Sequence, residues 1–315
     1  MAGRKHYPVS VAGWAFLAGA LLLLTVGSWV QAQDFRVGML VTEYGLVLLP
    51  VLLLGLWLRL DLRTALRLKP LSLRAALLIP VTVVLAMPIT LFLNLCVIAV
   101  LAWFGKAYGM PIPSAESLTD LSMLFFIISV SAGLCEEFFF RGMILDAYSS
   151  RFGSWAGIGL SALLFGFFHF NPQNLLGPVF LGLMFGYLVL LTGSIWAGVL
   201  AHMTNNGVAV LLMYGANLAQ EGALSAGSSA DLFNESPGQL LAALGVLGIL
   251  ALGSALAVWG LLSVLAGERK LPARAEAGGE GADSAAPLRA AEWVPLMLPM
   301  VFYIGICYYL LAIKT

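Results

Sequence analysis

The chain has 315 residues, of which 61% are hydrophobic and 10% are charged, and its 16 basic and 16 acidic side chains leave no formal net charge. A soluble domain usually has about 25% charged residues, and it cannot bury this much apolar surface without large exposed patches. The composition therefore excludes an ordinary soluble protein, a disordered chain and a nucleic-acid-binding protein, which would need a basic face.

Apolar segments long enough to cross a bilayer recur from one end of the chain to the other. This pattern predicts an all-α protein, a polytopic bundle of about eight or nine transmembrane helices that forms a single transmembrane domain over 1–315. The expected spans are 9–31, 37–58, 75–103, 119–145, 154–170, 175–193, 194–214, 238–266 and 292–312. The first is too long for the apolar part of a signal peptide and is read as a retained helix.

The basic residues predict the orientation, because cytoplasmic loops are enriched in Lys and Arg. With the N-terminus in the cytoplasm, 13 of the 16 Lys and Arg residues lie on or near that side, and only Arg36, Lys106 and Lys314 lie outside. The segment 267–291 is charged and rich in Gly, Ala and Pro, which predicts a flexible cytoplasmic loop. The basic stretch 59–74 is either a short amphipathic helix on the membrane surface or a solvated loop.

Cysteine usage excludes two kinds of site. The three cysteines, Cys96, Cys135 and Cys307, lie in apolar runs, and no CxxC pair occurs. A disulfide framework and a cysteine-based zinc site are therefore not expected.

Ionisable residues inside the expected spans are the functional candidates, because each is costly in lipid unless it is paired or hydrated. They are Glu136, Glu137, Arg141, His169 and His202. Glu43 and Asp120 are expected near span ends, from which they reach the interface.

The spacing within the fourth span predicts one ion pair. Glu137 and Arg141 are four residues apart and share a helix face, whereas Glu136 points about 100° away. The alternative for Glu137 and Arg141 is a purely structural role, in which their ion pair only holds helices together. Glu136 has no local partner, and burial suits it to act as a general base or a proton carrier. Its neighbour Cys135 faces another direction and is expected to pack in the core.

Two further spans contribute polar groups at helical spacing. Phe165 and His169 are one turn apart, and so are His202 and Asn206, which can both donate hydrogen bonds to one point. Helix–helix hydrogen bonding is the structural alternative for the second pair. At 1.5 Å per residue, Glu136, His169 and His202 lie about 15, 22 and 12 Å from the cytoplasmic ends of their helices, which predicts a shared polar cavity inside the membrane.

The chemistry that fits these groups is peptide-bond hydrolysis by an activated water. A carboxylate and a histidine polarise the water, and a second histidine and an amide stabilise the oxyanion. A zinc site made by Glu136, His169 and His202 is the rival reading, although no HExxH motif occurs.

The ordered motifs resemble those of a known family. Glu136-Glu137-x-x-x-Arg141, Phe165-x-x-x-His169 and His202-x-x-x-Asn206 are similar, in order and spacing, to the three motifs of the CAAX-protease and bacteriocin-processing family of intramembrane glutamic proteases. The resemblance covers about 130–210, within a catalytic core expected over 119–214. It implies that Glu136 and His169 activate the water, that His202 and Asn206 form the oxyanion hole, and that Glu137 and Arg141 shape and neutralise the site.

The expected function is therefore an intramembrane endopeptidase that cleaves near the C-terminus of a membrane-associated or lipid-modified protein or peptide, such as a C-terminal tail or sorting segment. No cofactor and no nucleic acid is expected, and the lipid bilayer is the surrounding partner. The Ala-, Gly- and Leu-rich composition favours a bacterial cytoplasmic membrane. A zinc-dependent intramembrane protease and a non-catalytic immunity or scaffold protein are the alternatives, and a proton-coupled transporter is a weaker one because no internal repeat is evident.

Overall fold

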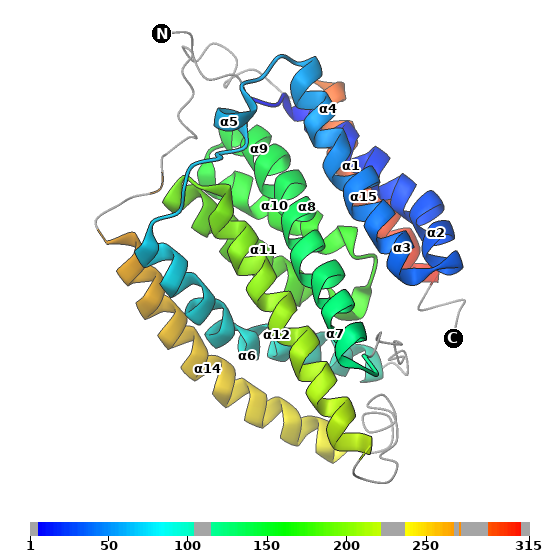
Figure 1. Ribbon diagram of the computed structural model, residues 1–315, viewed down its shortest axis with the longest axis vertical. Helices are drawn as coiled ribbons and strands as arrows, with labels where there is room; N and C mark the ends of the chain where they lie inside the picture. The colour runs from blue at the N-terminus through cyan, green and yellow to red at the C-terminus, as the bar shows by residue number, and fades with distance from the viewer. Residues whose placement is uncertain (1–5, 104–114, 222–236, 268–270, 272–288, 310–315) are drawn as a thin grey trace.

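The computed structural model describes residues 6–103, 115–221, 237–267, 271 and 289–309, and every regular element within them is helical (Figure 1). Eight helices are long and apolar enough to cross a membrane, and their bounds are Val9–Gln33, Phe35–Trp57, Leu73–Trp103, Leu118–Phe152, Pro172–Thr192, Ile195–Ala219, Gly238–Ala266 and Ala290–Tyr308. This confirms the predicted polytopic helical bundle.

The labelled elements subdivide these spans. The first three spans are α1 (Val9–Leu22), η1 (Leu23–Gly27) and α2 (Ser28–Gln33); α3 (Phe35–Leu40), η2 (Val41–Leu48) and α4 (Leu49–Trp57); and, after the short α5 (Leu62–Ala65), α6 (Leu73–Trp103). The fourth comprises α7 (Leu118–Leu124), η3 (Phe125–Ser131), α8 (Ala132–Glu137), η4 (Phe138–Ile144) and α9 (Leu145–Phe152). The remaining elements are α10 (Ser154–Phe168), η5 (Pro172–Asn174), α11 (Leu176–Thr192), α12 (Ile195–Glu221), α14 (Pro237–Ala266) and α15 (Ala290–Tyr308).

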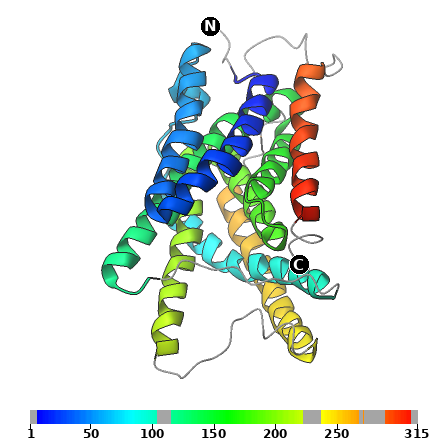
Figure 2. The ribbon, with the colours of Figure 1, turned by 90° about the vertical axis from the view of Figure 1, so that its right-hand side faces the viewer.

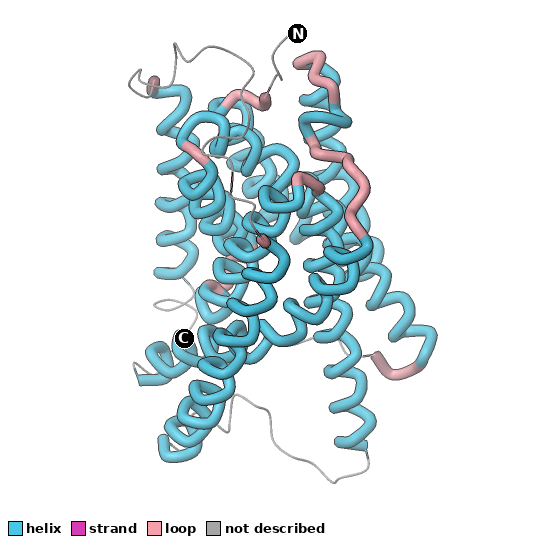
Figure 3. The backbone as a smooth tube through the Cα atoms, turned by 90° about the vertical axis from the view of Figure 1, so that its left-hand side faces the viewer, coloured by secondary structure: helices cyan, strands magenta, loops and turns pink. Residues whose placement is uncertain are grey.

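The helices form three groups (Figure 1). One side of the bundle holds α6 and α14, the other holds α1 to α4 with α15, and the elements from α7 to α12 lie between them. Figure 2 shows α6 crossing the bundle obliquely, and Figure 3 shows the described loops as short pink segments between helices. The central group is the part of the chain that carries the three sequence motifs.

Two apolar clusters hold the central group against its neighbours. Aromatic rings from α1, η4 and α10 interlock, with Phe140 making edge-to-face contacts with Phe16, Phe165 and Phe168 at centroid distances of 5.1–6.2 Å. A second cluster joins α6, α11, α12 and α14 around the fully buried Phe185. Cys135 is fully buried in the first cluster, as its expected packing role requires.

The helix α10 is shorter than the eight candidate membrane spans. Its 15 residues extend about 22 Å, which is less than the roughly 30 Å of a bilayer's hydrocarbon core. The connection to α11 is tied to the side of α6, because Asn94 donates to Asn174 Oδ1 at 2.6 Å and accepts from the backbone N–H of Gly177 at 2.8 Å.

A buried polar cluster fastens the end of the bundle nearest residue 6. The carboxylate of Asp146, fully buried on α9, lies 3.0 Å from His6 Nδ1 and 3.2 Å from Arg67 Nη2. Arg67 is itself only 6% exposed, so it does not face lipid headgroups. The stretch 59–74 holds the short helix α5 and, from Leu73, the start of α6, so it is neither an extended surface helix nor a fully solvated loop.

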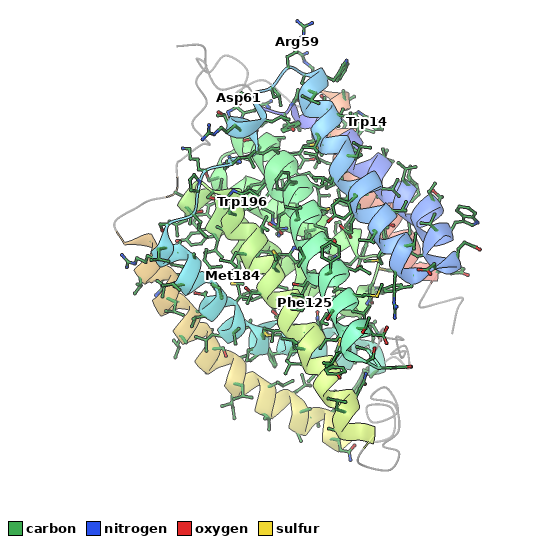
Figure 4. The ribbon with its side chains drawn as sticks, in the orientation of Figure 1. Trp14, Arg59, Asp61, Phe125, Met184 and Trp196 are labelled. Carbon is green, nitrogen blue, oxygen red and sulfur yellow. The ribbon has the colours of Figure 1, made fainter. Side chains whose placement is uncertain are left out.

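That same end of the bundle carries most of the described basic side chains, and Figure 4 shows Arg59 projecting beyond the helices there. The turn between α11 and α12 also lies there, where Gly193 ends α11 with a φ of +67° and Ser194 Oγ donates to the carbonyl of Lys69 at 2.6 Å. Most of the predicted loop 267–291 and the last residues of the predicted span 292–312 fall outside the described residues.

Candidate active site

A buried ionic chain joins two helices at the centre of the candidate site. Arg141 Nη1 donates to Glu137 Oε1 at 2.6 Å, and His202 Nδ1 lies 3.0 Å from the same oxygen. Arg141 and Glu137 are fully buried, and His202 is 4% exposed. The ion pair predicted from the four-residue spacing is therefore present, and it extends to a histidine on α12.

Aromatic rings line this ionic chain. The guanidinium of Arg141 lies 4.4 Å from the ring centroid of Phe165 and 5.3 Å from that of Phe185, distances at which a cation is attracted to a ring face. His202 also contacts both rings, with centroid distances of 5.7 and 5.5 Å. The rings exclude water and strengthen the attraction between Arg141 and Glu137, because the local dielectric is low.

The close approach of α12 depends on Gly198, which the sequence analysis did not single out. A methyl group at this position would collide with Glu137 Oε2 and would lie 2.9 Å from Val189 Cγ2. Gly198 precedes His202 by one helical turn, so both face the Glu137 carboxylate. A glycine one turn before a candidate histidine was the signal that could have identified it.

His169 lies at the end of α10, where the backbone leaves the helix. Its Nδ1 is 2.8 Å from the carbonyl oxygen of Phe165. A carbonyl oxygen only accepts hydrogen bonds, so Nδ1 carries a proton, and Nε2 is the atom that can accept one in the neutral form of the ring. The His169 side chain is exposed, and the following residue, Phe170, has a φ of +47°. Irregular backbone at membrane depth is tolerated where it is buried in protein or lines a hydrated cavity.

Asn206 links α12 to the helix that carries the glutamates. Its Nδ2 donates to the carbonyl of Ile128 at 2.9 Å, and its Oδ1 accepts from Asn205 at 3.0 Å. One turn earlier, the carbonyl of Met203 accepts from Ser129 Oγ at 2.8 Å. The amide of Asn206 carries two N–H groups, so one is left to donate elsewhere.

Glu136 is half-buried on α8, and its Oε2 is a buried oxygen without a hydrogen-bond partner. Within the part of the chain that the structure describes, no hydrogen bond joins Glu136 to His169, and Phe165 lies between His169 and His202, with its ring in contact with both. Glu136 also interacts electrostatically with Arg141. Glu137, Arg141 and His202 thus form one buried chain, His169 contacts the ring of Phe165 beside it, and Glu136 Oε2 has no hydrogen-bond partner among the described residues.

Glu43 was expected near a span end, and the structure contradicts this. It lies about 12 Å along its helix from Phe35, is 4% exposed, and interacts electrostatically with Glu136. Sequence spacing gave no sign of this contact, because it depends on how η2 packs against α8. Asp120 does lie near a helix start, where Arg36 Nη2 donates to it at 2.6 Å.

A metal-binding cluster was the rival interpretation of Glu136, His169 and His202. Among the described residues, no group of three or more His, Cys, Asp or Glu side chains converges in a way that could hold a metal ion.

Residues 119–208 match the family model described as type II CAAX prenyl endopeptidase Rce1-like. This confirms, over that segment, the resemblance to CAAX proteases that the three motifs predicted, and it indicates a protease. The eight apolar helices among the described residues indicate an integral membrane protein, and residues 119–208 of it are similar to this endopeptidase family. No curated protein and no solved structure matches the chain significantly.

Proposed function

We propose, from the match of residues 119–208 to the Rce1-like type II CAAX prenyl endopeptidase family, that this chain is an endopeptidase of the glutamic type. Its substrate is a membrane-associated or lipid-modified protein or peptide, cleaved near its C-terminus. Glu136 and His169 activate a water, His202 and Asn206 hold the oxyanion, and Glu137 and Arg141 fix the geometry. The observation that carries the proposal is the buried chain from Arg141 through Glu137 to His202 beside an unpartnered Glu136 oxygen.

The first step is attack by water on the scissile carbonyl carbon. Glu136 takes a proton from the water as the new C–O bond forms, and Nε2 of His169, as a hydrogen-bond acceptor, orients the same water. The carbonyl oxygen gains the negative charge. When the C–N bond breaks, the proton held by Glu136 passes to the leaving nitrogen, so that the carboxylate is regenerated.

The oxyanion needs donors that are in place before the reaction. With Nδ1–H of His202 held by the Glu137 carboxylate, Nε2 donates to the oxyanion only in a ring that carries both protons. The second N–H of Asn206 is the other donor. Arg141 balances the charge of the Glu137 carboxylate in an apolar setting.

We also propose that the N-terminus is cytoplasmic and that the membrane is the bacterial cytoplasmic membrane. The connections 58–61, 66–72, 153 and 193–194 lie at the same end of the bundle as residue 6, and this end carries Arg59, Arg63, Arg67, Lys69 and Arg74. A cluster of basic residues in short loops favours the cytoplasmic face.

The test compares the wild type with Glu136→Gln in proteoliposomes and in cells. Cleavage of a farnesylated peptide and of its unmodified counterpart is followed by mass spectrometry, and the C-termini of membrane proteins are compared between cells that express each form. The expected result is loss of cleavage in Glu136→Gln at an unchanged protein level, with Glu292→Gln, a change at the exposed start of α15, as the matched control.

Three outcomes would replace the proposal. Full cleavage by Glu136→Gln would remove Glu136 from the chemistry, and loss of cleavage on chelation, with stoichiometric zinc in the purified protein, would show that the protease depends on a metal ion. If the wild type cleaves nothing but retains a bound partner in every motif variant, the protein is a scaffold.

A further inference from the structure

A second carboxyl group lies beside the proposed catalytic glutamate. Glu43, on η2 in the second span, is 4% exposed, and its Oε2 is buried without a hydrogen-bond partner. An unpaired carboxyl inside a membrane span is costly, so its neighbours matter. The buried Oε2 atoms of Glu43 and Glu136 are both unpartnered, on two helices that pack together.

The neighbours of Glu43 locate it relative to the site. Its charge interacts with that of Glu136, and the thiol of Cys135 interacts with both carboxyl groups. One residue further along η2, Tyr44 OH donates to Ser131 Oγ at 3.2 Å, which joins the same two helices. Glu43 therefore faces α8 at the level of Glu136.

Among the described residues of the elements packed against η2, the cations are Arg36 on α3 and Arg141 on η4, and each is paired with another carboxylate. The elements α1, η1 and α4, which pack beside η2, contain no Asp, Glu, Lys, Arg or His. Arg36, on the preceding α3, is paired with Asp120, and the hydrogen bond of Arg141 goes to Glu137. Two carboxyl groups held together in a medium of low dielectric do not both ionise, and they retain one proton between them.

We propose that Glu43 and Glu136 form a carboxyl pair that shares a single proton, with Glu43 as a positioning residue for the catalytic Glu136. The catalytic role of Glu136 in this proposal rests on the proposed function. The shared proton does not depend on that function. A protonated Glu43 donates a hydrogen bond to the Glu136 carboxylate, which leaves Glu136 able to accept the proton of the attacking water. The proton on Glu43 is not consumed in the reaction.

The pH–rate profile tests the pair. In an acid pair, the first proton is lost at a lower pH than from a lone buried carboxyl, as in the aspartic proteases. Glu43→Gln breaks the pair, so we expect the midpoint of the acidic limb to move to higher pH by roughly one unit or more, with a fall in kcat and little change in KM. Glu43→Asp restores part of the wild-type profile.

Tyr44→Phe is the matched control, because it removes a hydrogen bond between the same two helices without changing a carboxyl group. We expect its acidic limb to coincide with that of the wild type. An unchanged midpoint in Glu43→Gln would reduce Glu43 to a structural residue, and a shift to lower pH would mean that Glu43 is an ionised neighbour. Either result overturns the proposal.

Infrared absorption tests the shared proton without catalysis. The purified wild type at neutral pH is expected to show a protonated-carboxyl band that is absent from Glu43→Gln and present in Tyr44→Phe. Identical bands in all three proteins would overturn the pair. Because this measurement needs no substrate, it separates failure of the pair from failure of the proposed function, which is judged by cleavage in Glu136→Gln.

Discussion

Glu137 and His202 lie on different helices, and one oxygen of the Glu137 carboxylate, Oε1, is 3.0 Å from His202 Nδ1. The same oxygen accepts the hydrogen bond from Arg141. Because of this contact, the orientation of His202, a proposed oxyanion donor, depends on the ion pair between Glu137 and Arg141, which belongs to another motif. The two motifs therefore act as one unit, and changes in them are expected to be non-additive.

Removing the charge of Glu137 leaves Arg141 uncompensated in the core. We expect Glu137→Gln to lower the free energy of unfolding by about 3–5 kcal/mol, because a buried charge that loses its partner is costly. Unfolding in mixed micelles, monitored by tryptophan fluorescence, measures this. Glu292→Gln, the same change at a partly buried residue in the first turn of α15, serves as control, and equal stability of the two variants would show that the pair contributes nothing.

Gly198→Ala places a methyl group against the Glu137 carboxylate. The carboxylate must move, and His202 moves with it, so we expect kcat to fall about a hundredfold, the effect of an error of about 1 Å at a reacting centre. Gly253→Ala is the control, because nothing lies within 4 Å of a methyl group added there. Cleavage rates of both variants in proteoliposomes check the prediction, which fails if Gly198→Ala retains wild-type kcat.

Asn94→Leu removes the amide that holds the connection between α10 and α11. The N–H of Gly177 and the side chain of Asn174 lose their partner, so we expect a loss of about 1–3 kcal/mol in stability and a lower kcat as His169 loses its position. Thr90→Val, one turn earlier on α6, changes only a hydrogen bond within its own helix. Equal activity of the two variants would show that the Asn94 contacts do not affect catalysis.

Asp146→Asn weakens the cluster that joins residue 6, the stretch around Arg67 and α9. The fully buried carboxylate is replaced by a neutral amide beside a buried arginine, so we expect lower thermal stability and faster proteolysis of the N-terminal segment. Asp61→Asn, on the exposed N-cap of α5, is the comparison. If both variants unfold at the same temperature as the wild type, the cluster does not contribute to stability.

Local geometry explains why the membrane spans and the pairing of Glu137 with Arg141 could be predicted from the sequence. The spans follow from the length of apolar chain that crosses a bilayer, and the pairing of Glu137 with Arg141 follows from the helical repeat. The position of Glu43 was wrong because burial depends on which helix covers a residue, and spacing along one helix does not contain that information.

Gly198 and Asn94 show the same limit. Gly198 matters because of a carboxylate 61 positions earlier, and Asn94 because its amide reaches residues 80 and 83 positions later. Neither contact has a periodic signature. The distance in sequence between the partners is the reason that composition and motif spacing do not reveal them.

The shortness of α10 also has a consequence for the lipid around the protein. A helix of 15 residues is about 8 Å shorter than a typical hydrocarbon core, and such hydrophobic mismatch is relieved by local thinning of the bilayer. A thinner membrane beside His169 would shorten the path by which water and the proposed C-terminal tail reach the site. The proposed cleavage would then respond to the acyl-chain length of the host membrane as well as to the substrate.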